Sequence, residues 1–332
     1  MTKIIEFKNI CKEFKIPEKR TGKWSTFLNF FKRKYKIINA LKNVNFSIDE
    51  GDIVGYIGPN GAGKSTTIKI MSGILTPTTG ECIIDGYTPW KNRKEYVKNI
   101  GVVFGQRSQL WWDVPVIDSF ELLKDIYKIK DDEYKDTLKL LNEALDLEQL
   151  LPRPLRQLSL GQKMKCELAA SLLHRPKILF LDEPTIGLDA VTKLAVRDFI
   201  KYINKVWHTT IILTTHDMND IEALTNKIIL IGKGQILYNG SFDTIKNKYA
   251  NEKIIQVEFA KPYEKILLNG YELISHDKNV AVFKTKKDTE FHTKAFINEI
   301  SKEYDIIDFS VNSLSVDEIL ARLYKEYELQ EK

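Results

Sequence analysis

The sequence predicts an α/β protein in which a mostly parallel sheet and a helical subdomain precede a small C-terminal α+β domain. Short apolar runs typical of buried strands recur along the first part of the chain, at residues 51–58, 100–104, 178–181, 210–214 and 227–231. Segments with helical periodicity separate several of these runs, and such alternation favours a largely parallel sheet.

The length and the change of pattern along the chain indicate two domains. The 332 residues exceed the usual size of one domain. We expect a first domain over residues 1–240, with a helical subdomain at about 107–175, and a C-terminal accessory domain over 241–332. Strand and helix candidates alternate in the second domain, at residues 253–259, 280–286, 291–300 and 315–327.

The composition is that of an ordinary globular protein. Hydrophobic residues make up 43% and charged residues 29%, and no run approaches the roughly 18 apolar residues of a membrane-spanning helix. The N-terminal residues lack the apolar core of a signal peptide. A net charge of +5 is too small for this length to indicate nucleic-acid binding. We therefore expect a protein that does not cross a membrane by itself and has no nucleic-acid partner.

Cysteine usage favours a reducing compartment. Cys11, Cys82 and Cys166 are odd in number, far apart and without CxxC spacing. Neither a disulfide framework nor a zinc site is supported by this pattern.

A glycine-rich loop between a predicted strand and a predicted helix is typical of phosphate binding. The loop matches GxxxxGK[ST], and its predicted nucleotide-binding residues are Gly58, Pro59, Asn60, Gly61, Ala62, Gly63, Lys64, Ser65 and Thr66. Glycines let the backbone N–H groups approach phosphate oxygens, and the helix start adds a positive dipole end. We expect Lys64 to reach the β- and γ-phosphates and the Ser65 hydroxyl to bind Mg²⁺. The alternative is a chance glycine-rich turn.

Two carboxylates and a histidine follow later strands. Asp182 and Glu183 end an apolar run, where Asp182 would help to hold Mg²⁺ and Glu183 would act as general base on the attacking water. A solvated turn is the simpler interpretation of this pair. His216 follows the strand at 210–214, where it would contact the γ-phosphate or orient the water, although a lone histidine at a strand end is more often structural.

The segment Leu158-Ser159-Leu160-Gly161-Gln162 lies between the phosphate loop and the two carboxylates. With this segment the sequence resembles the ATP-binding cassette (ABC) family, whose LSGGQ-like signature from one subunit closes on the γ-phosphate held by the other. The resemblance covers residues 3–240 and implies that Ser159, Gly161 and Gln162 contact ATP. Leu160 replaces the first glycine of the usual signature, which leaves the serine and the second glycine intact.

The resemblance implies further site residues and partners. Gln106 would contact Mg²⁺ or water and sense the membrane partner, and Asp189, in a turn that resembles the family's D-loop, would bridge two subunits. The expected cofactors are ATP and Mg²⁺. The expected partners are a second copy of the chain and two integral-membrane permease subunits, which would hold this chain at the cytoplasmic face of the membrane. Phe14 is the expected aromatic residue that stacks on adenine, and Tyr35 is the alternative.

A basic insertion at about residues 17–36 places aromatic and aliphatic side chains at helical spacing, namely Trp24, Phe27, Leu28 and Phe31. It could lie on an anionic membrane surface, touch the permease, or pack on its own domain with a solvated basic face. Trp111 and Trp112 fall where the family docks a permease, and they could equally be core residues.

Residues 101–123, the LSLGQ segment with the basic helix that follows it, and the basic insertion together look most like ATPases of the drug, viologen and fluoroquinolone exporter branch. Export is therefore the expected direction of transport, and an importer ATPase is the alternative because its core motifs look alike. A soluble ABC ATPase acting on ribosomes or DNA would carry two cassettes or a long coiled coil. A nonhydrolytic binding module would be expected to lack Glu183 or His216, and both are present.

Overall fold

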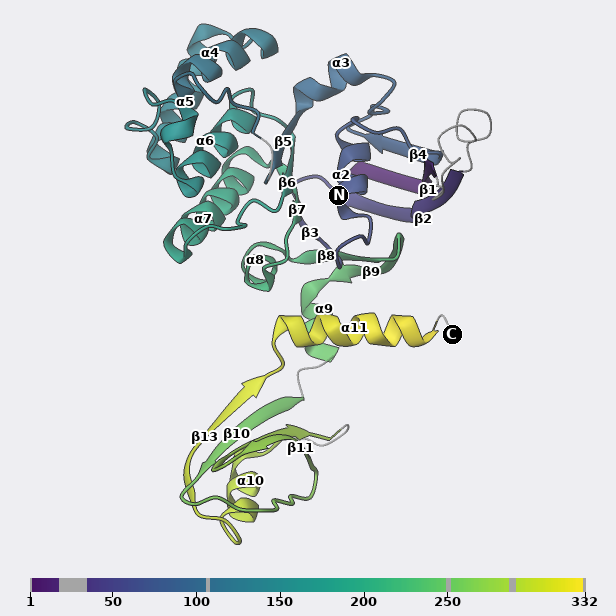
Figure 1. The fold of residues 1–332 in the computed structure, drawn as a ribbon. Coiled ribbons are helices and arrows are strands. Elements are labelled where there is room, and N and C mark those ends of the chain that lie inside the picture. The colour runs from purple at the N-terminus through teal and green to yellow at the C-terminus, as the bar shows by residue number, and fades with distance from the viewer. Residues whose placement is uncertain (1, 18–34, 106–107, 249–251, 287–290, 331–332) are drawn as a thin grey trace, which may run out of the picture. The chain divides into compact units, whose positions relative to one another are not determined.

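The computed structural model describes residues 2–17, 35–105, 108–248, 252–286 and 291–330 (Figure 1). The chain divides into two compact units, Met1–Gly240 and Ser241–Lys332, and each unit encloses a hydrophobic core of its own. Within the described ranges no helix has the length and apolar character needed to cross a membrane.

A six-stranded sheet forms the centre of the first unit. Its strands, in spatial order, are β5 (Ile100–Phe104), β6 (Ile178–Asp182), β7 (Thr210–Thr214), β3 (Ile53–Ile57), β8 (Lys227–Gly232) and β9 (Gln235–Ser241). The pairings from β5 through to β8 are parallel. Val54, Phe180 and Ile212 are fully buried, as expected for strands covered on both faces. The predicted α/β class with a mostly parallel sheet is confirmed.

A separate antiparallel sheet lies beside it, in the order β2 (Tyr35–Asp49), β1 (Lys3–Pro17) and β4 (Thr79–Ile84). The register of β1 shifts around Asn9, which has a φ of 52° and whose N–H donates to the Asn45 side chain at 2.8 Å. Such bulges, together with the charged side chains from Lys12 to Lys15, break the apolar alternation. The outer halves of both long strands therefore have no clear signal in the sequence.

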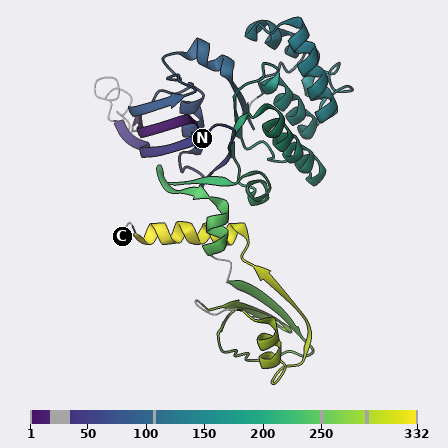
Figure 2. The same ribbon diagram turned by 180° about the vertical axis from the view of Figure 1, so that it is seen from behind.

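The helices of the first unit are α2 (Lys64–Met71), α3 (Arg93–Tyr96), α4 (Val116–Tyr127), α5 (Asp131–Leu145), α6 (Leu160–Leu172), α7 (Ala190–Trp207) and α8 (Met218–Leu224). Short 3₁₀ turns cover Val97–Asn99 and Leu155–Gln157. Both views show α4 to α7 gathered on one side of the parallel sheet and the antiparallel sheet on the other (Figures 1 and 2). The helices α4, α5 and α6 fall within the range expected for a helical subdomain.

The second unit contains a four-stranded antiparallel sheet, in the order β11 (Tyr271–Asp277), β12 (Val280–Thr285), β10 (Lys253–Phe259) and β13 (Ile306–Ser313). Its helices are α9 (Phe242–Lys248), α10 (Thr293–Ile300) and α11 (Val316–Gln330). Phe259, Phe283 and Phe296 form the centre of its core and are almost completely buried. The edge strands β11 and β13 are largely exposed, so the sequence gives little hydrophobic signal for them.

His174, which follows α6, is a neutral structural histidine. Its ring stacks on Tyr127 with centroids 3.9 Å apart, and its Nε2 lies 2.9 Å from the Ile100 carbonyl oxygen, which accepts the ring N–H. Among the described residues Nδ1 has no hydrogen-bond partner. Burial lowers the pKa of His174 to about 4.

The low pKa of His174 predicts a specific loss of stability in acid. The unfolded chain takes up a proton at this histidine below a pKa of about 6.5, whereas the folded chain does so only near pH 4. The contribution of neutral His174 to the free energy of unfolding is therefore present above pH 6.5. It is lost as the pH falls toward 4, by up to about 3 kcal/mol. Urea unfolding at pH 7 and pH 4.5 should show this extra loss in the wild type and not in His174→Gln. Equal losses in both proteins would contradict it.

Candidate nucleotide-binding site

The loop between β3 and α2 requires glycine where its backbone approaches neighbouring strands. A Cβ on Gly58 would lie 2.4 Å from the Ile231 carbonyl oxygen, and one on Gly63, whose φ is 113°, would lie 2.9 Å from that of Ala40. The loop is closed by a hydrogen bond from the Ala62 N–H to the Pro59 carbonyl oxygen at 3.1 Å. Only glycine fits these two positions, and the result is a tight concave loop.

The start of α2 is open to an anion. Gly63 occupies the N-cap position and supplies no side-chain cap, and the first turn contains no acidic residue. The N–H groups at the beginning of a helix lack intrahelical partners and carry the positive end of the dipole. The loop and the helix start therefore form a site suited to phosphate.

Lys64 lies inside the loop. Its side chain is only 7% exposed, and its ammonium group donates to the carbonyl oxygens of Gly58 at 2.5 Å and Pro59 at 3.2 Å. Burial lowers the pKa of Lys64, and the nearby carboxylates of Glu183 and Asp182 counteract that shift. A cation is thus held between the loop and the two acidic side chains.

Asp182 and Glu183 reach this edge because the carboxyl ends of parallel strands meet there. Asp182 is the last residue of β6, and its Oδ1 accepts a hydrogen bond from the Thr214 hydroxyl at 2.5 Å. Glu183 follows with a φ of 57°, and its N–H donates to the Thr214 carbonyl oxygen at 2.9 Å. The left-handed backbone turns Glu183 out of the strand direction at the point where the chain leaves the sheet.

Glu183 contacts His216. The Nε2 atom of His216 lies 2.7 Å from Oε1 of Glu183, and the side chains are 44% and 23% exposed. A carboxylate paired with an imidazole at an accessible edge can accept a proton from a water molecule and orient that water.

A cavity of about 340 Å³ connects the loop with the acidic strand end. It is lined by Ser65, Lys69, Ile74, Phe104, Gly105, Asp182 and Glu183. The Ser65 hydroxyl and the Asp182 carboxylate are hard oxygen donors of the kind that Mg²⁺ takes. Over the described part of the chain no group of three or more His, Cys, Asp or Glu residues could hold a metal ion. Ser65 and Asp182 fit two of the ligand positions of an ion that takes its other ligands from phosphate and water, as Mg²⁺ commonly does.

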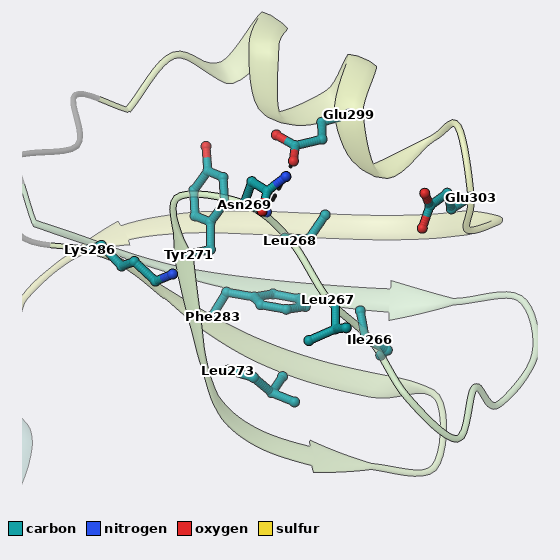
Figure 3. A pocket seen from close by; sticks show the side chains of 10 residues that line it. All are labelled: Ile266, Leu267, Leu268, Asn269, Tyr271, Leu273, Phe283, Lys286, Glu299 and Glu303. Carbon is teal, nitrogen blue, oxygen red and sulfur yellow. Dashed lines mark hydrogen bonds between the residues drawn. The ribbon is translucent and has the colours of Figure 1, made fainter.

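The second unit has a larger cavity, of about 490 Å³, of a different character (Figure 3). Phe283, Ile266 and Leu268 supply apolar surface, while the Glu299 carboxylate already accepts a hydrogen bond from the Asn269 N–H at 3.1 Å. Its lining residues include no glycine and none from the first turn of a helix.

The residues from Ser159 to Gln162 lie at the start of α6 and do not line the phosphate cavity. The Ser159 hydroxyl accepts from the Gln162 N–H at 3.3 Å, and the Gln162 side-chain oxygen accepts from the Ser159 N–H at 2.9 Å. This capping box begins α6 at Ser159. A Cβ on Gly161 would lie 2.9 Å from Thr192 of α7, so the two helix starts pack closely together.

Asp189 caps α7. Its carboxylate accepts from the N–H of Thr192 at 2.9 Å and from the Thr192 hydroxyl at 2.7 Å, and these hydrogen bonds lower the pKa of Asp189. The resemblance implied a contact with a second subunit for this residue, and that role stays a prediction.

Several predicted residues are apart from the cavity. Phe14 and Tyr35 lie in the β1–β2 hairpin, where Lys12 covers the Phe14 ring at 5.2 Å, and neither aromatic residue lines the cavity. Gln106 and the side chains Trp24, Phe27, Leu28 and Phe31 of the insertion lie outside the described residues. The choice of the adenine-stacking residue stays a prediction.

The two adjacent tryptophans are surface residues. Trp111 is 45% and Trp112 is 55% exposed, and Lys163 covers the Trp112 ring at 4.4 Å. The interpretation of either tryptophan as a core residue is therefore wrong. The turns that precede α4 carry them to the surface.

Sequence reasoning missed the polar side chains behind the site. Thr214 binds Asp182. The buried side chains of Thr185, Thr215 and Asp220, with the partly buried Arg197, form a hydrogen-bonded group behind Glu183 and His216. The signal available was the run Thr214-Thr215-His216-Asp217, in which short polar residues follow an apolar strand. Its contact partners are distant in sequence, so periodicity could not identify them.

Comparison with known proteins agrees with a nucleotide-binding site of this geometry. The family model described as "ABC transporter" matches residues 41–186. The methionine import ATP-binding protein MetN 2 of Enterococcus faecalis is 31% identical over 83% of this chain and 82% of its own length. The chain belongs to the ABC transporter family as an ATP-binding subunit.

Other relatives match a smaller share of the chain. The ABC transporter ATP-binding protein NatA of Bacillus subtilis is 28% identical over 70% of this chain and 94% of its own length. The probable multidrug ABC transporter ATP-binding protein YbhF of Escherichia coli is 33% identical, and the match spans 67% of this chain and 38% of YbhF. A dimeric ATP-binding cassette, MJ0796, solved with ADP and Pi, matches with a TM-score of 0.59 at 28% identity, over 71% of this chain and 98% of that one.

The close approach at Gly58 predicts that a single methyl group weakens nucleotide binding. In Gly58→Ala the loop has to move away from the Ile231 carbonyl oxygen, which separates the N–H groups from the phosphates. We expect the Kd for ATP to rise at least about 10-fold, measured by calorimetry.

Gly61→Ala is the matched control. Gly61 also has a positive φ, of 80°, yet nothing lies within 4 Å of the added Cβ. Its effect should be limited to backbone strain of about 1 kcal/mol. Equal losses of affinity in the two variants would contradict the packing argument.

Proposed function

We propose that this chain is the Mg·ATP-hydrolysing motor of an ABC exporter. Its nucleotide lies between Lys64 and the two carboxylates, Glu183 acts as general base, and His216 orients Glu183 and the attacking water. The observation that supports this proposal best is the 2.7 Å contact between Glu183 and His216 beside the phosphate loop.

The chemistry follows from the arrangement of these groups. Glu183 accepts a proton from the attacking water while the oxygen of that water forms a bond to the γ-phosphorus. The bond from the γ-phosphorus to the bridging oxygen breaks, and ADP leaves with that oxygen. Lys64 offsets negative charge on the phosphates. Asp182 and the Ser65 hydroxyl would hold Mg²⁺, which supplies further charge neutralisation at the β- and γ-phosphates. Gln106 is proposed to contact the ion or the water.

A second copy of the chain completes the site in this proposal. Ser159, Gly161 and Gln162 lie at a helix start away from their own chain's cavity, so they would contact the γ-phosphate of a partner chain. Asp189 would bridge the two copies. The matching cassette MJ0796 was solved as a dimer with ADP and Pi, which supports the same arrangement here.

Two permease subunits are the proposed membrane partners, with this chain held at the cytoplasmic face. Trp111 and Trp112 supply exposed apolar surface close to Gln106 in sequence, as a docking site for a permease requires. Export is supported by the resemblance of residues 101–123 to the drug exporter branch and by the similarity to the probable multidrug protein YbhF.

Import is the second candidate direction. The similarity to MetN 2, which is named as a methionine import protein, favours it and extends over 83% of this chain. Residues 241–332 are proposed to be an accessory domain and residues 17–36 a basic insertion, neither of which carries a phosphate-binding motif.

Removal of the general base should stop turnover and leave binding intact. In Glu183→Gln we expect kcat to fall at least about 100-fold, because the amide cannot accept the proton, with the Kd for ATP within about threefold of the wild type. Glu50→Gln, at an exposed turn, is the control and should hydrolyse ATP normally. Unchanged hydrolysis in Glu183→Gln would exclude the general-base role.

Reconstitution with the proposed permease partners should alter the ATPase rate. We expect Trp112→Ala to weaken that response and to leave the basal rate of the isolated chain unchanged, because Trp112 is 55% exposed and is not among the residues that line the cavity. Vesicles loaded with candidate substrate then decide the direction. ATP-driven uptake that depends on an external binding protein would replace the exporter proposal with the importer.

A further inference from the structure

The two proposed catalytic side chains come from different loops. Glu183 follows β6, His216 follows β7, and the side chains meet at 2.7 Å. The contact between these two loop residues depends on how both backbones are held. The support lies behind the pair, in a group of buried polar side chains.

Asp220 is the centre of that group. It lies in α8, is fully buried, and its Oδ2 accepts hydrogen bonds from two hydroxyl groups. One donor is Thr185, two residues after Glu183, and the other is Thr215, directly before His216, at 3.0 Å. A single carboxylate oxygen thus joins the two loops.

The other oxygen of Asp220 is fixed to α7. Its Oδ1 accepts a hydrogen bond from Nε of Arg197 at 2.6 Å, and Nη2 of the same guanidinium lies 2.6 Å from that oxygen. This ion pair neutralises the buried charge and helps to set the orientation of the carboxylate. Both remaining donors, Thr185 and Thr215, are themselves only 2% exposed.

The contacts close into a ring. From Glu183 the path runs through His216 to Thr215, through Asp220 to Thr185, and back along the chain to Glu183. The Thr215 hydroxyl also accepts from the Asp217 N–H at 2.9 Å, so it orders the His216 turn from both sides. The left-handed backbone of Glu183 is uncommon for a residue other than glycine. The ring holds it through the Glu183 contact with His216 and through the hydrogen bond of Thr185, two residues later, to Asp220.

We propose that Asp220 is a positioning residue that holds Glu183 and His216 in contact through the hydroxyl groups of Thr185 and Thr215. The inference rests on the proposed roles of Glu183 and His216 in hydrolysis. Asp220 itself is buried behind the pair and acts through the two threonines, so its effect is on the geometry of the pair and not on substrate binding.

Isosteric threonine variants test this without opening a cavity. Thr185→Val and Thr215→Val remove one hydroxyl each, while Thr185→Ser and Thr215→Ser keep it. We expect kcat for ATP to fall about 10- to 100-fold in the valine variants with an unchanged Kd for ATP, because a displaced general base loses alignment with the water. The serine variants should retain kcat within about threefold.

Thr225→Val controls for the loss of a buried hydroxyl as such. Thr225 is 4% exposed and its hydroxyl donates to the Ile221 carbonyl oxygen at 2.9 Å, outside the ring. All three valine variants should lower Tm by about 2–4 °C, and only the two ring variants should lower kcat. An equal fall of kcat in Thr225→Val would show that the ring threonines have a merely structural role and would overturn the inference.

A second measurement does not depend on catalysis. With ¹³C-labelled histidine, the His216 ring signals should shift in Thr185→Val, although Thr185 does not touch His216, and the His276 signals in the second unit should not. If Glu183→Gln hydrolyses ATP normally, the proposed function fails, and the His216 signals still decide the inference. Shifted signals support the ring, and unshifted signals overturn it.

Discussion

The parallel pairing of β6, β7 and β3 is the constraint on which the rest of the site depends. It brings the ends of three strands to one edge, where Asp182 is in register with Thr214. The phosphate loop leaves β3 at the same edge, and its glycines allow it to lie against the β8 backbone. An antiparallel neighbour would direct one of these ends to the opposite side of the sheet.

The elements with strong local patterns could be predicted from sequence, and those that depend on tertiary contacts could not. The buried strands β3, β5, β6, β7 and β8 are continuous apolar runs, and the structure contains all of them. The outer halves of β1 and β2 pair charged residues with exposed apolar ones, such as Lys15 with Ile37, and this pairing leaves no periodic signal in the sequence. The exposed edge strands β11 and β13 of the second unit likewise leave no hydrophobic pattern in the sequence.

For the site, the motif residues could be named in advance because each follows an apolar strand or opens a helix. Lys64, Ser65, Asp182, Glu183 and His216 are all found at the same edge of the sheet. The residues that hold them in place carry no motif, since Asp220 and Arg197 are joined to the site by contacts between distant segments. Trp111 and Trp112 are exposed because the turns before α4 carry both side chains to the surface. Composition alone cannot predict the direction of these turns.

The tight junction between α6 and α7 has a mechanical consequence. Gly161 lies so close to Thr192 that not even a methyl group fits between them, and a Cβ on Gly187 would lie 2.9 Å from the Leu160 side chain. The two helix starts therefore cannot slide toward each other, and a push on one displaces the other. Since Lys193 and Arg197 of α7 bind Asp217 and Asp220, such a displacement reaches the turn that carries His216 as a rigid-body movement of one helix.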